Sequence, residues 1–240
     1  MNTELSIVMF AFNEAENVDP ILRELVSWLR VNDTQSEIVF VDDGSTDRTT
    51  EAATRTLTDL GMAHRVVRHE RNLGIGAALK SGVRAASGQW VTFMPADGQI
   101  APAAIGTLRA ARDEADADVV LSVYDHRDDG TYRRVLSAGV RALIWAVHGV
   151  KLHSDGPYLF RRSLFDPEQL KPDTFFLNFE FPIRVLAAGL KVATVTIECR
   201  SRRAGSSKSA SLGRIVGVAK DLVDLRVRRT KDAIQNALGR

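Results

Sequence analysis

The sequence predicts an α/β fold: a doubly wound, mostly parallel sheet flanked by helices and followed by a C-terminal amphipathic helix. Two observations support this. Short apolar runs alternate with longer segments of helical periodicity, which is the pattern of β-α units. In addition, the apolar run at 38–41 ends abruptly at Asp42 and Asp43. A strand that is buried on both faces and ends in polar residues is typical of a parallel sheet, where ligands bind at the carboxyl edge.

The first half of the chain consists of successive strand and helix patterns. The expected strands are the apolar runs at 5–11, 37–41, 90–94 and 118–123 and a short strand at 64–69. The expected helices are the periodic segments at 18–30, with Pro20 in the first turn, and at 47–60, 74–86 and 102–115. Residues 13–17 are expected to form a polar loop, and Ser45 or Thr46 to cap the second helix. This order predicts parallel strands joined by crossover helices.

The second half is less regular. It predicts a partly basic helix at 133–150, strands at 158–161 and 191–198, and a helix at 180–188 between them. The last helix is expected at 212–237, where apolar residues recur near helical spacing among many Lys and Arg residues. These apolar residues are Leu212, Ile215, Val218, Leu222, Leu225 and Val227. Such a stripe can lie on an anionic membrane or pack on the protein, and the sequence leaves both uses open.

The composition narrows the class of protein. A chain of 240 residues can bury the core of one large domain, and a net charge of +2 gives no reason to expect nucleic acid as a partner. The single cysteine, Cys199, excludes a disulfide within the chain and fits a reducing compartment. The start has no signal-peptide pattern, and no apolar run approaches the ~20 residues that span a bilayer.

Carboxylates follow two of the expected strands. Asp42 and Asp43 suit a base edge, a pair of ribose hydroxyls or a metal, although both could equally be turn and cap residues. Asp97 and Gln99 follow the strand at 90–94 and offer oxygen ligands for Mg²⁺ or Mn²⁺ bound to a diphosphate. The alternative for this second pair is a plain Asp-Gly turn. Two acidic strand ends in one parallel sheet favour the site.

Three further features have both a functional and a structural interpretation. Gly74 and Gly76 precede a helix whose start, with Lys80, would favour an anionic oxygen; small residues also allow close helix packing. Glu180 lies just ahead of its helix and is either a base that faces the ligand or a first-turn acid. The basic segment 202–208 is either a loop that closes on phosphates or a solvated tail.

Five motifs in order resemble the family 2 glycosyltransferases with a GT-A fold, and most closely the dolichol-phosphate mannosyltransferase and polyprenyl-phosphate glycosyltransferase group. The resemblance covers residues 5–208. The motifs are Phe10-Ala-Phe-Asn-Glu14, Val41-Asp-Asp-Gly-Ser-Thr-Asp47, the Asn-x-Gly-x-Gly-Ala-Ala run that follows Arg71, Pro95-Ala-Asp-Gly-Gln99 and Arg202-x-x-Gly-x-Ser-Lys208.

The chain departs from the family pattern at three places. Pro95 replaces the first Asp of the metal motif, so more of the metal coordination would come from the diphosphate and water. Phe10 and Phe12 replace the Pro and Tyr of the first motif, which removes a tyrosine hydroxyl. Residues 155–158 replace the Ser-Gly-Phe-Arg run of the family, and Tyr158 stands where the family has an arginine. A contact of this arginine with the acceptor is therefore in doubt.

The resemblance implies a GT-A glycosyltransferase catalytic domain at 1–210, and the residue pattern predicts a basic amphipathic helix at 211–240. The implied reaction is inverting transfer of a sugar from a UDP- or GDP-sugar to a polyprenyl or dolichyl phosphate. The implied cofactor is Mg²⁺ or Mn²⁺ on Asp97 and Gln99, which neutralises leaving-group charge. The implied nucleotide-sugar ligands are Ala11, Glu14, Asp42, Asp43, Gly74, Lys80, Ala96 and Asp97.

The acceptor side is implied in the same way. Arg133, Ser137, Arg202 and Lys208 would hold the acceptor phosphate, and Asp97, Glu180, Arg202 and Lys208 would be the catalytic residues. An acceptor glycan, glycolipid or protein would instead need a general base, for which Glu180 is the candidate; a non-catalytic nucleotide-sugar-binding protein is a second alternative.

The expected partners follow from this acceptor. The protein would bind peripherally to the cytoplasmic, inner face of a membrane, either directly or through a small membrane protein. The sequence leaves open whether it forms a homo-oligomer.

Overall fold

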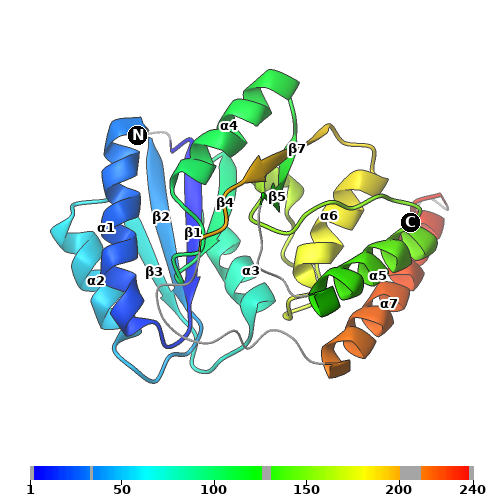
Figure 1. The fold of residues 1–240 in the computed structure, drawn as a ribbon, viewed down its shortest axis with the longest axis horizontal. Coiled ribbons are helices and arrows are strands. Elements are labelled where there is room, and N and C mark those ends of the chain that lie inside the picture. Colours follow the sequence, from blue (N-terminus) through cyan, green and yellow to red (C-terminus); the bar gives the residue numbers. More distant parts are fainter. Residues whose placement is uncertain (1–2, 33–34, 126–130, 201–211, 238–240) are drawn as a thin grey trace.

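The computed structural model describes residues 3–32, 35–125, 131–200 and 212–237. Its centre is a seven-stranded sheet with the order β3-β2-β1-β4-β6-β5-β7 (Figure 1). β6 is antiparallel to β4 and β5, and the other paired strands described are parallel. The strands are β1 (Leu5–Ala11), β2 (Ser36–Asp42), β3 (His64–Arg68), β4 (Trp90–Pro95), β5 (Val119–Tyr124), β6 (Leu159–Arg161) and β7 (Val192–Ile197).

Helices cover both faces of the sheet, which gives three layers. On one face, α1, α2 and α4 pack over a core that includes Leu22, Leu57 and Ile105. On the other face, α3 and α6 pack over a second core that also receives α5 and α7. The helices are α1 (Ala15–Asn32), α2 (Thr49–Asp59), α3 (Ile75–Ala85), α4 (Ala103–Ala115), α5 (Thr131–His148), α6 (Leu177–Ala187), α7 (Leu212–Ala237) and the short 3₁₀ helix η1 (Arg162–Leu164).

The mostly parallel α/β fold is confirmed, and each expected element is present with its ends shifted by a few residues. Two shifts are corrections. α1 begins at Ala15, inside the expected polar loop, because the Glu14 carbonyl accepts the N–H groups of Asn17 and Val18; Pro20 therefore lies in the second turn. α6 begins at Leu177, so Glu180 lies within its first turn and not ahead of it.

The expected cap of α2 was also wrong. Neither Ser45 nor Thr46 caps this helix, which begins at Thr49. Ser45 Oγ instead accepts the N–H of Asn13 at 2.9 Å, and the Thr46 N–H donates to Asn13 Oδ1 at 2.9 Å. These side chains join the β2–α2 loop to the β1–α1 loop, so contacts between loops replace the local cap.

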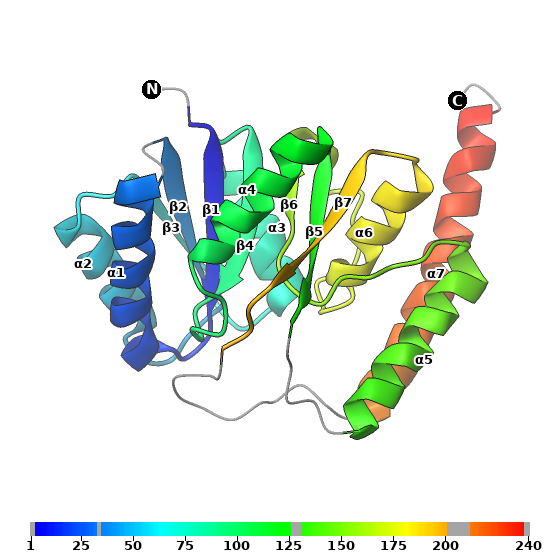
Figure 2. The ribbon, with the colours of Figure 1, turned by 45° about the horizontal axis from the view of Figure 1, so that its top comes forward.

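The C-terminal helix α7 packs on the rest of the chain. Leu222 and Leu225 are fully buried, and Val218 packs against the same core as α5 and α6. Figure 2 shows α5 and α7 side by side, at the end of the molecule remote from α1 and α2. Packing on the protein therefore accounts for much of the apolar stripe. Within the described part of the chain, no helix combines the length and apolarity needed to cross a bilayer.

Candidate nucleotide-sugar site

The carboxyl edge of the sheet brings together the residues that follow β1, β2 and β4. These three strands are neighbours in the sheet, and the register places Ala11 opposite Asp42. The Asp43 N–H donates to the Ala11 carbonyl at 2.9 Å, and the Ala96 N–H donates to the Phe10 carbonyl at 3.0 Å. Three of the predicted motifs thus meet at one edge, where parallel sheets bind ligands.

Asp43 organises the loop that precedes α3. One carboxylate oxygen contacts His69 Nδ1 at 2.7 Å and accepts the Leu73 N–H at 2.9 Å, while the other accepts the Gly74 N–H at 2.9 Å. His69 Nε2 lies 2.9 Å from Ser81 Oγ. His69 was not among the predicted site residues, although its position at the end of the expected strand 64–69 was a usable signal.

Asp42 is fully buried at the end of β2. One of its oxygens accepts the Ser45 N–H at 2.9 Å, and the other accepts the Thr50 hydroxyl. Arg68 Nε lies 3.8 Å from this second oxygen. The position of Asp42 is as predicted, but its carboxylate has the contacts expected of a turn-stabilising residue.

The loop of the first motif is fastened to the loop of the second. The Glu14 N–H donates to Thr49 Oγ1 at 2.9 Å, and the Glu14 carboxylate accepts Asn17 Nδ2 at 2.6 Å. Asp47 accepts the Ala15 N–H at 3.2 Å and also bonds Thr49. Burial acts to raise the pKa of Asp47, but these hydrogen bonds outweigh it and hold the pKa below its usual value. The edge is therefore built from interlocked loops.

Asp97 and Gln99 form the turn after β4. Asp97 is 7 % exposed, and its Oδ1 accepts the Gln99 N–H at 3.1 Å. The Gln99 carbonyl accepts the Arg200 N–H at 2.8 Å, and Arg200 Nη1 lies 2.6 Å from Glu24 Oε1 on α1. The turn is thus tied to the segment that leads out of β7, a contact that joins residues about a hundred positions apart.

The donor atoms of this turn fit Mg²⁺ or Mn²⁺. A carboxylate and an amide are the oxygen ligands that these hard ions prefer, with diphosphate and water oxygens completing the shell. In the described ranges, no group of three or more His, Cys, Asp and Glu side chains is placed to hold a metal by itself. Asp97 and Gln99 would therefore hold an ion whose coordination shell is completed by oxygen atoms of a diphosphate.

The start of α3 differs from the anion site that was expected there. The Lys80 ammonium donates to the Lys171 carbonyl at 3.1 Å and to Asp173 Oδ1 at 2.9 Å. The N–H groups of Leu73 and Gly74 bind Asp43. The groups that were expected to bind phosphate thus contact protein acceptors, and the structure favours the packing interpretation of the two glycines.

Glu180 does not face a ligand, although this was expected of a catalytic base. Its side chain is fully buried, and its two oxygens accept Arg228 Nη1 at 2.8 Å and Nη2 at 2.9 Å. Arg184 Nε lies 2.9 Å from the same carboxylate. A carboxylate enclosed by two guanidinium groups on α6 and α7 is a structural ion pair and not a base that faces a ligand.

The expected acceptor residues are only partly described. Ser137 lies half-buried on α5, and Arg133 belongs to the same helix, but the side chain of Arg133 lies outside the described ones. Arg202 and Lys208 also lie outside the described residues. Tyr158, which replaces the family arginine, is a core residue that packs against Phe93, Phe160 and Phe181, and burial raises its pKa well above the usual value.

The sequence profile of glycosyl transferase family 2 matches residues 6–185. The chain belongs to this family. It is 32% identical over 170 residues to a dodecaprenyl-phosphate galacturonate synthase of Rhizobium johnstonii, covering 70% of this chain and 50% of that protein. It is also 32% identical over 226 residues to an undecaprenyl-phosphate 4-deoxy-4-formamido-L-arabinose transferase of Pseudomonas paraeruginosa, covering 91% and 64%. The chain thus spans between half and two thirds of the length of these relatives.

Solved structures share the fold. Glucosyl-3-phosphoglycerate synthase of Mycobacterium tuberculosis in complex with Mn²⁺, uridine diphosphate and phosphoglyceric acid superposes with a TM-score of 0.69, at 22% identity, covering 95% of this chain and 78% of that one. The same enzyme with Mg²⁺ and uridine diphosphate gives a TM-score of 0.69 at 21% identity, covering 95% and 79%. At this identity the likeness confirms the GT-A fold alone.

Proposed function

We propose that the protein is an inverting glycosyltransferase that moves a sugar from a UDP- or GDP-sugar to a polyprenyl phosphate. The observation that carries the proposal is the convergence of the family motifs from β1, β2 and β4 on one carboxyl edge. The named activities of the relatives, a dodecaprenyl-phosphate galacturonate synthase and an undecaprenyl-phosphate 4-deoxy-4-formamido-L-arabinose transferase, support the lipid phosphate acceptor.

On the donor side, the nucleoside would lie along the edge formed by Ala11, Glu14, Asp42 and Asp43. The two aspartates would act largely by holding the loops that surround the nucleoside, since backbone N–H groups already bind their oxygens. Asp97 and Gln99, with the neighbouring Ala96, would hold a Mg²⁺ or Mn²⁺ ion, which when bound neutralises charge on the diphosphate leaving group.

The state of Glu180 supports a phosphate acceptor over a hydroxyl acceptor. A sugar or serine hydroxyl must lose a proton to a base as it attacks, whereas a phosphate monoester is already ionised near neutral pH. Glu180 is enclosed by Arg184 and Arg228 and is not available for this task. An ionised acceptor needs positioning, which Arg133, Ser137, Arg202 and Lys208 would supply. Work on such a lipid would place the protein at the inner face of a membrane.

A transfer assay tests the proposal. The protein is incubated with a panel of UDP- and GDP-sugars, with and without a short-chain polyprenyl phosphate, in Mn²⁺, Mg²⁺ or EDTA. We expect sugar transfer to the lipid phosphate with one donor class, and loss of transfer in EDTA. Faster transfer to a water-soluble phosphorylated acid or to a free glycan than to the lipid would overturn the acceptor. Nucleotide-sugar binding without turnover on any acceptor would overturn the enzyme assignment.

A further inference from the structure

A four-residue segment, Lys171 to Thr174, lies directly on the first turns of α3. Lys80, only 6 % exposed, donates from Nζ to the carbonyl of Lys171 at 3.1 Å and to Oδ1 of Asp173 at 2.9 Å. The Ala77 N–H donates to the Asp173 carbonyl at 3.1 Å. A buried ammonium needs such acceptors, since it would otherwise be desolvated without compensation. Segment 171–174 is therefore fastened to α3 by side-chain and backbone contacts.

The glycines of the motif that precedes α3 make room for this segment. A Cβ atom on Gly76 would lie 2.5 Å from the Thr174 carbonyl oxygen and 2.6 Å from the Asp173 carbonyl carbon. A Cβ on Gly74 would lie 2.8 Å from the Asp173 carbonyl oxygen. Side chains cannot be accommodated at such distances from backbone atoms. Both glycines thus allow the close approach of segment 171–174, whether or not a phosphate is bound.

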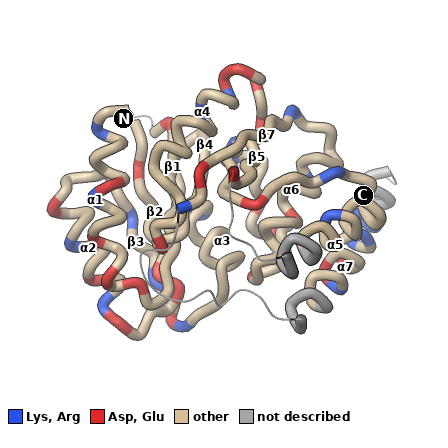
Figure 3. Tube along the Cα trace, viewed as in Figure 1, with Lys and Arg blue, Asp and Glu red and all other residues tan. Residues whose placement is uncertain are grey.

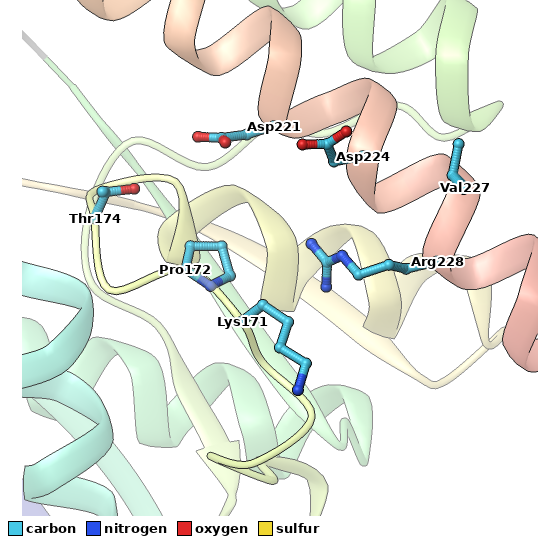
Figure 4. A pocket seen from close by; sticks show the side chains of 7 residues that line it. All are labelled: Lys171, Pro172, Thr174, Asp221, Asp224, Val227 and Arg228. Carbon is cyan, nitrogen blue, oxygen red and sulfur yellow. The ribbon is translucent and has the colours of Figure 1, made fainter.

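The same segment forms one wall of a pocket on the side of α7. The pocket, of about 440 Å³, is lined by Lys171, Pro172 and Thr174 from the segment and by four side chains from α7 (Figure 4). Those four are Asp221, Asp224, Val227 and Arg228. The Thr174 carbonyl also accepts the Leu177 N–H at 3.2 Å at the start of α6. Segment 171–174 therefore connects α6 and α7 to the donor edge, which is the proposed nucleoside-binding edge formed by Ala11, Glu14, Asp42 and Asp43.

The charges at this contact argue against a phosphate on Lys80. Asp173 pairs with the ammonium, and the Asp43 carboxylate already accepts the N–H groups of Leu73 and Gly74 at the start of the helix. A diphosphate placed here would meet two carboxylates, and the Lys80 ammonium is already paired. An anion would have to displace Asp173 to reach Lys80.

We infer that Lys80 is a positioning residue: it fixes segment 171–174 against Gly74 and Gly76, and so sets the α6–α7 side of the protein relative to the donor edge. Since α7 packs against α5, which carries the proposed acceptor residues Arg133 and Ser137, the effect of Lys80 on the reaction is on the use of the acceptor, and it does not contact the nucleotide. The inference rests on the proposed function for the identity of the substrates only, since the contact between Lys80 and the segment stands without it.

Three single variants, one double variant and three kinds of measurement test this role. Lys80→Met and Asp173→Asn remove the two ends of the contact. Arg84→Met is the matched control, because Arg84 lies on the same helix and pairs with Glu168 at an exposed site next to the segment. Calorimetry with UDP or GDP in the absence of metal reports nucleotide contact. Steady-state kinetics with donor and polyprenyl phosphate varied in turn separates the two Michaelis constants, and hydrogen exchange of residues 171–177 follows the segment itself.

We expect Lys80→Met and Asp173→Asn to lower kcat/KM for the lipid acceptor about tenfold, because a small displacement of a binding wall is enough for such a loss. The donor KM and the metal-free nucleotide affinity should stay within about twofold, and the double variant should be no worse than either single one. Exchange of the amides at 171–177 should speed up in both variants but not in Arg84→Met.

A different pattern would overturn the inference. If Lys80→Met weakens metal-free nucleotide binding about tenfold while Asp173→Asn leaves it unchanged, Lys80 is a phosphate ligand. Unchanged exchange at 171–177 in Lys80→Met would show that it does not hold the segment. If the wild-type protein transfers no sugar to polyprenyl phosphate, the proposed function fails, but nucleotide calorimetry and hydrogen exchange still decide the role of Lys80.

Discussion

The donor edge and the helix group α5–α6–α7 hold their charged residues in different ways. At the donor edge, carboxylates such as Asp43 accept backbone N–H groups of neighbouring loops. In the helix group, charged side chains pair with one another across helices, as Glu180 does with Arg184 and Arg228. An acid in the first region therefore holds the loops of the proposed donor site, while an acid in the second holds helices together. Substitutions should separate the two regions by what they damage.

The largest effect is expected at Asp97. Asp97→Ala removes the one carboxylate of the β4 turn, since Pro95 cannot ligate a metal. Because a metal contact is worth several kcal/mol in the transition state, we expect transfer to fall about a hundredfold or more with an unchanged melting temperature. Rates in Mn²⁺, Mg²⁺ and EDTA measure this, and Asp113→Ala on the exposed face of α4 is the control. Near-normal turnover that EDTA still abolishes would remove Asp97 from the metal site.

Glu180 should show the opposite behaviour, with a loss of stability. Glu180→Ala leaves Arg228 and Arg184 without their carboxylate, and breaking a buried pair costs about 3 kcal/mol of unfolding free energy. Arg228→Met should destabilise in the same direction, because it leaves the buried carboxylate with Arg184 as its main cation. Chemical denaturation measures both. If Glu180→Gln instead abolishes transfer while stability is kept, Glu180 is a general base and the acceptor is a hydroxyl.

Asp43 tests how the donor edge acts on the nucleotide. Asp43→Ala releases the N–H groups of Leu73 and Gly74 together with His69, so metal-free UDP or GDP affinity should fall about tenfold. His69→Gln should reproduce part of this loss if Asp43 works through the loop. Calorimetry on both variants sharpens the comparison: full affinity in His69→Gln with a large loss in Asp43→Ala would mean that the carboxylate touches the nucleotide directly.

His148 should make the helix group sensitive to pH. It is buried at the end of α5, with Nε2 3.0 Å from the Leu222 carbonyl and Nδ1 3.2 Å from Arg229 Nη1. Burial holds the pKa of His148 below the usual 6.5, aided by the charges of Arg229 and Arg226 on α7. The hydrogen bond to the Leu222 carbonyl and the carboxylate of Glu180 act in the opposite direction, but they do not outweigh burial.

The sign of the pH effect follows from this depressed pKa. The neutral imidazole is favoured in the folded state, so its contribution is complete above pH 6.5 and is lost as the pH falls through the lowered pKa. Between pH 7.5 and 5.5 the wild type should lose more stability than His148→Gln, whose side-chain amide does not take up a proton in this range. Denaturant titrations at the two pH values measure the difference; equal losses would contradict it.

The sequence predicted the backbone better than the partners of the side chains. Apolar runs and helical periodicity are local, and they were sufficient for the strands and for the convergence of Ala11, Asp43 and Asp97 on one edge. The pairing of Lys80 with Asp173 and of Glu180 with Arg228 was not predictable, because these partners lie 93 and 48 positions away in the chain. A charged residue in a motif has the same local pattern whether it meets a ligand or a distant side chain.

The smallest effect is expected for membrane attachment through the helix group. Lys and Arg recur along α7 (Figure 3), and Trp145 on the neighbouring α5 and Val223 on α7 are 59 % and 53 % exposed. A basic face with exposed apolar side chains binds anionic bilayers, with each Lys or Arg near the surface contributing about 1 kcal/mol. The polyprenyl tail of the proposed acceptor would require this proximity to a membrane.

Deleting α7 is not a clean test of attachment, because Leu222 and Leu225 belong to the core. We therefore expect the double variant Trp145→Ala and Val223→Ser to float about fivefold less with vesicles that contain anionic lipid, while its melting temperature is kept. Val31→Ser is the matched control, since Val31 is 83 % exposed on α1 at the other end of the molecule. Flotation of the wild type should also weaken in high salt, which screens the basic face. Equal flotation of the double variant and the control would leave α5 and α7 a purely structural pair, and membrane proximity would then have to come from another part of the protein or from a partner.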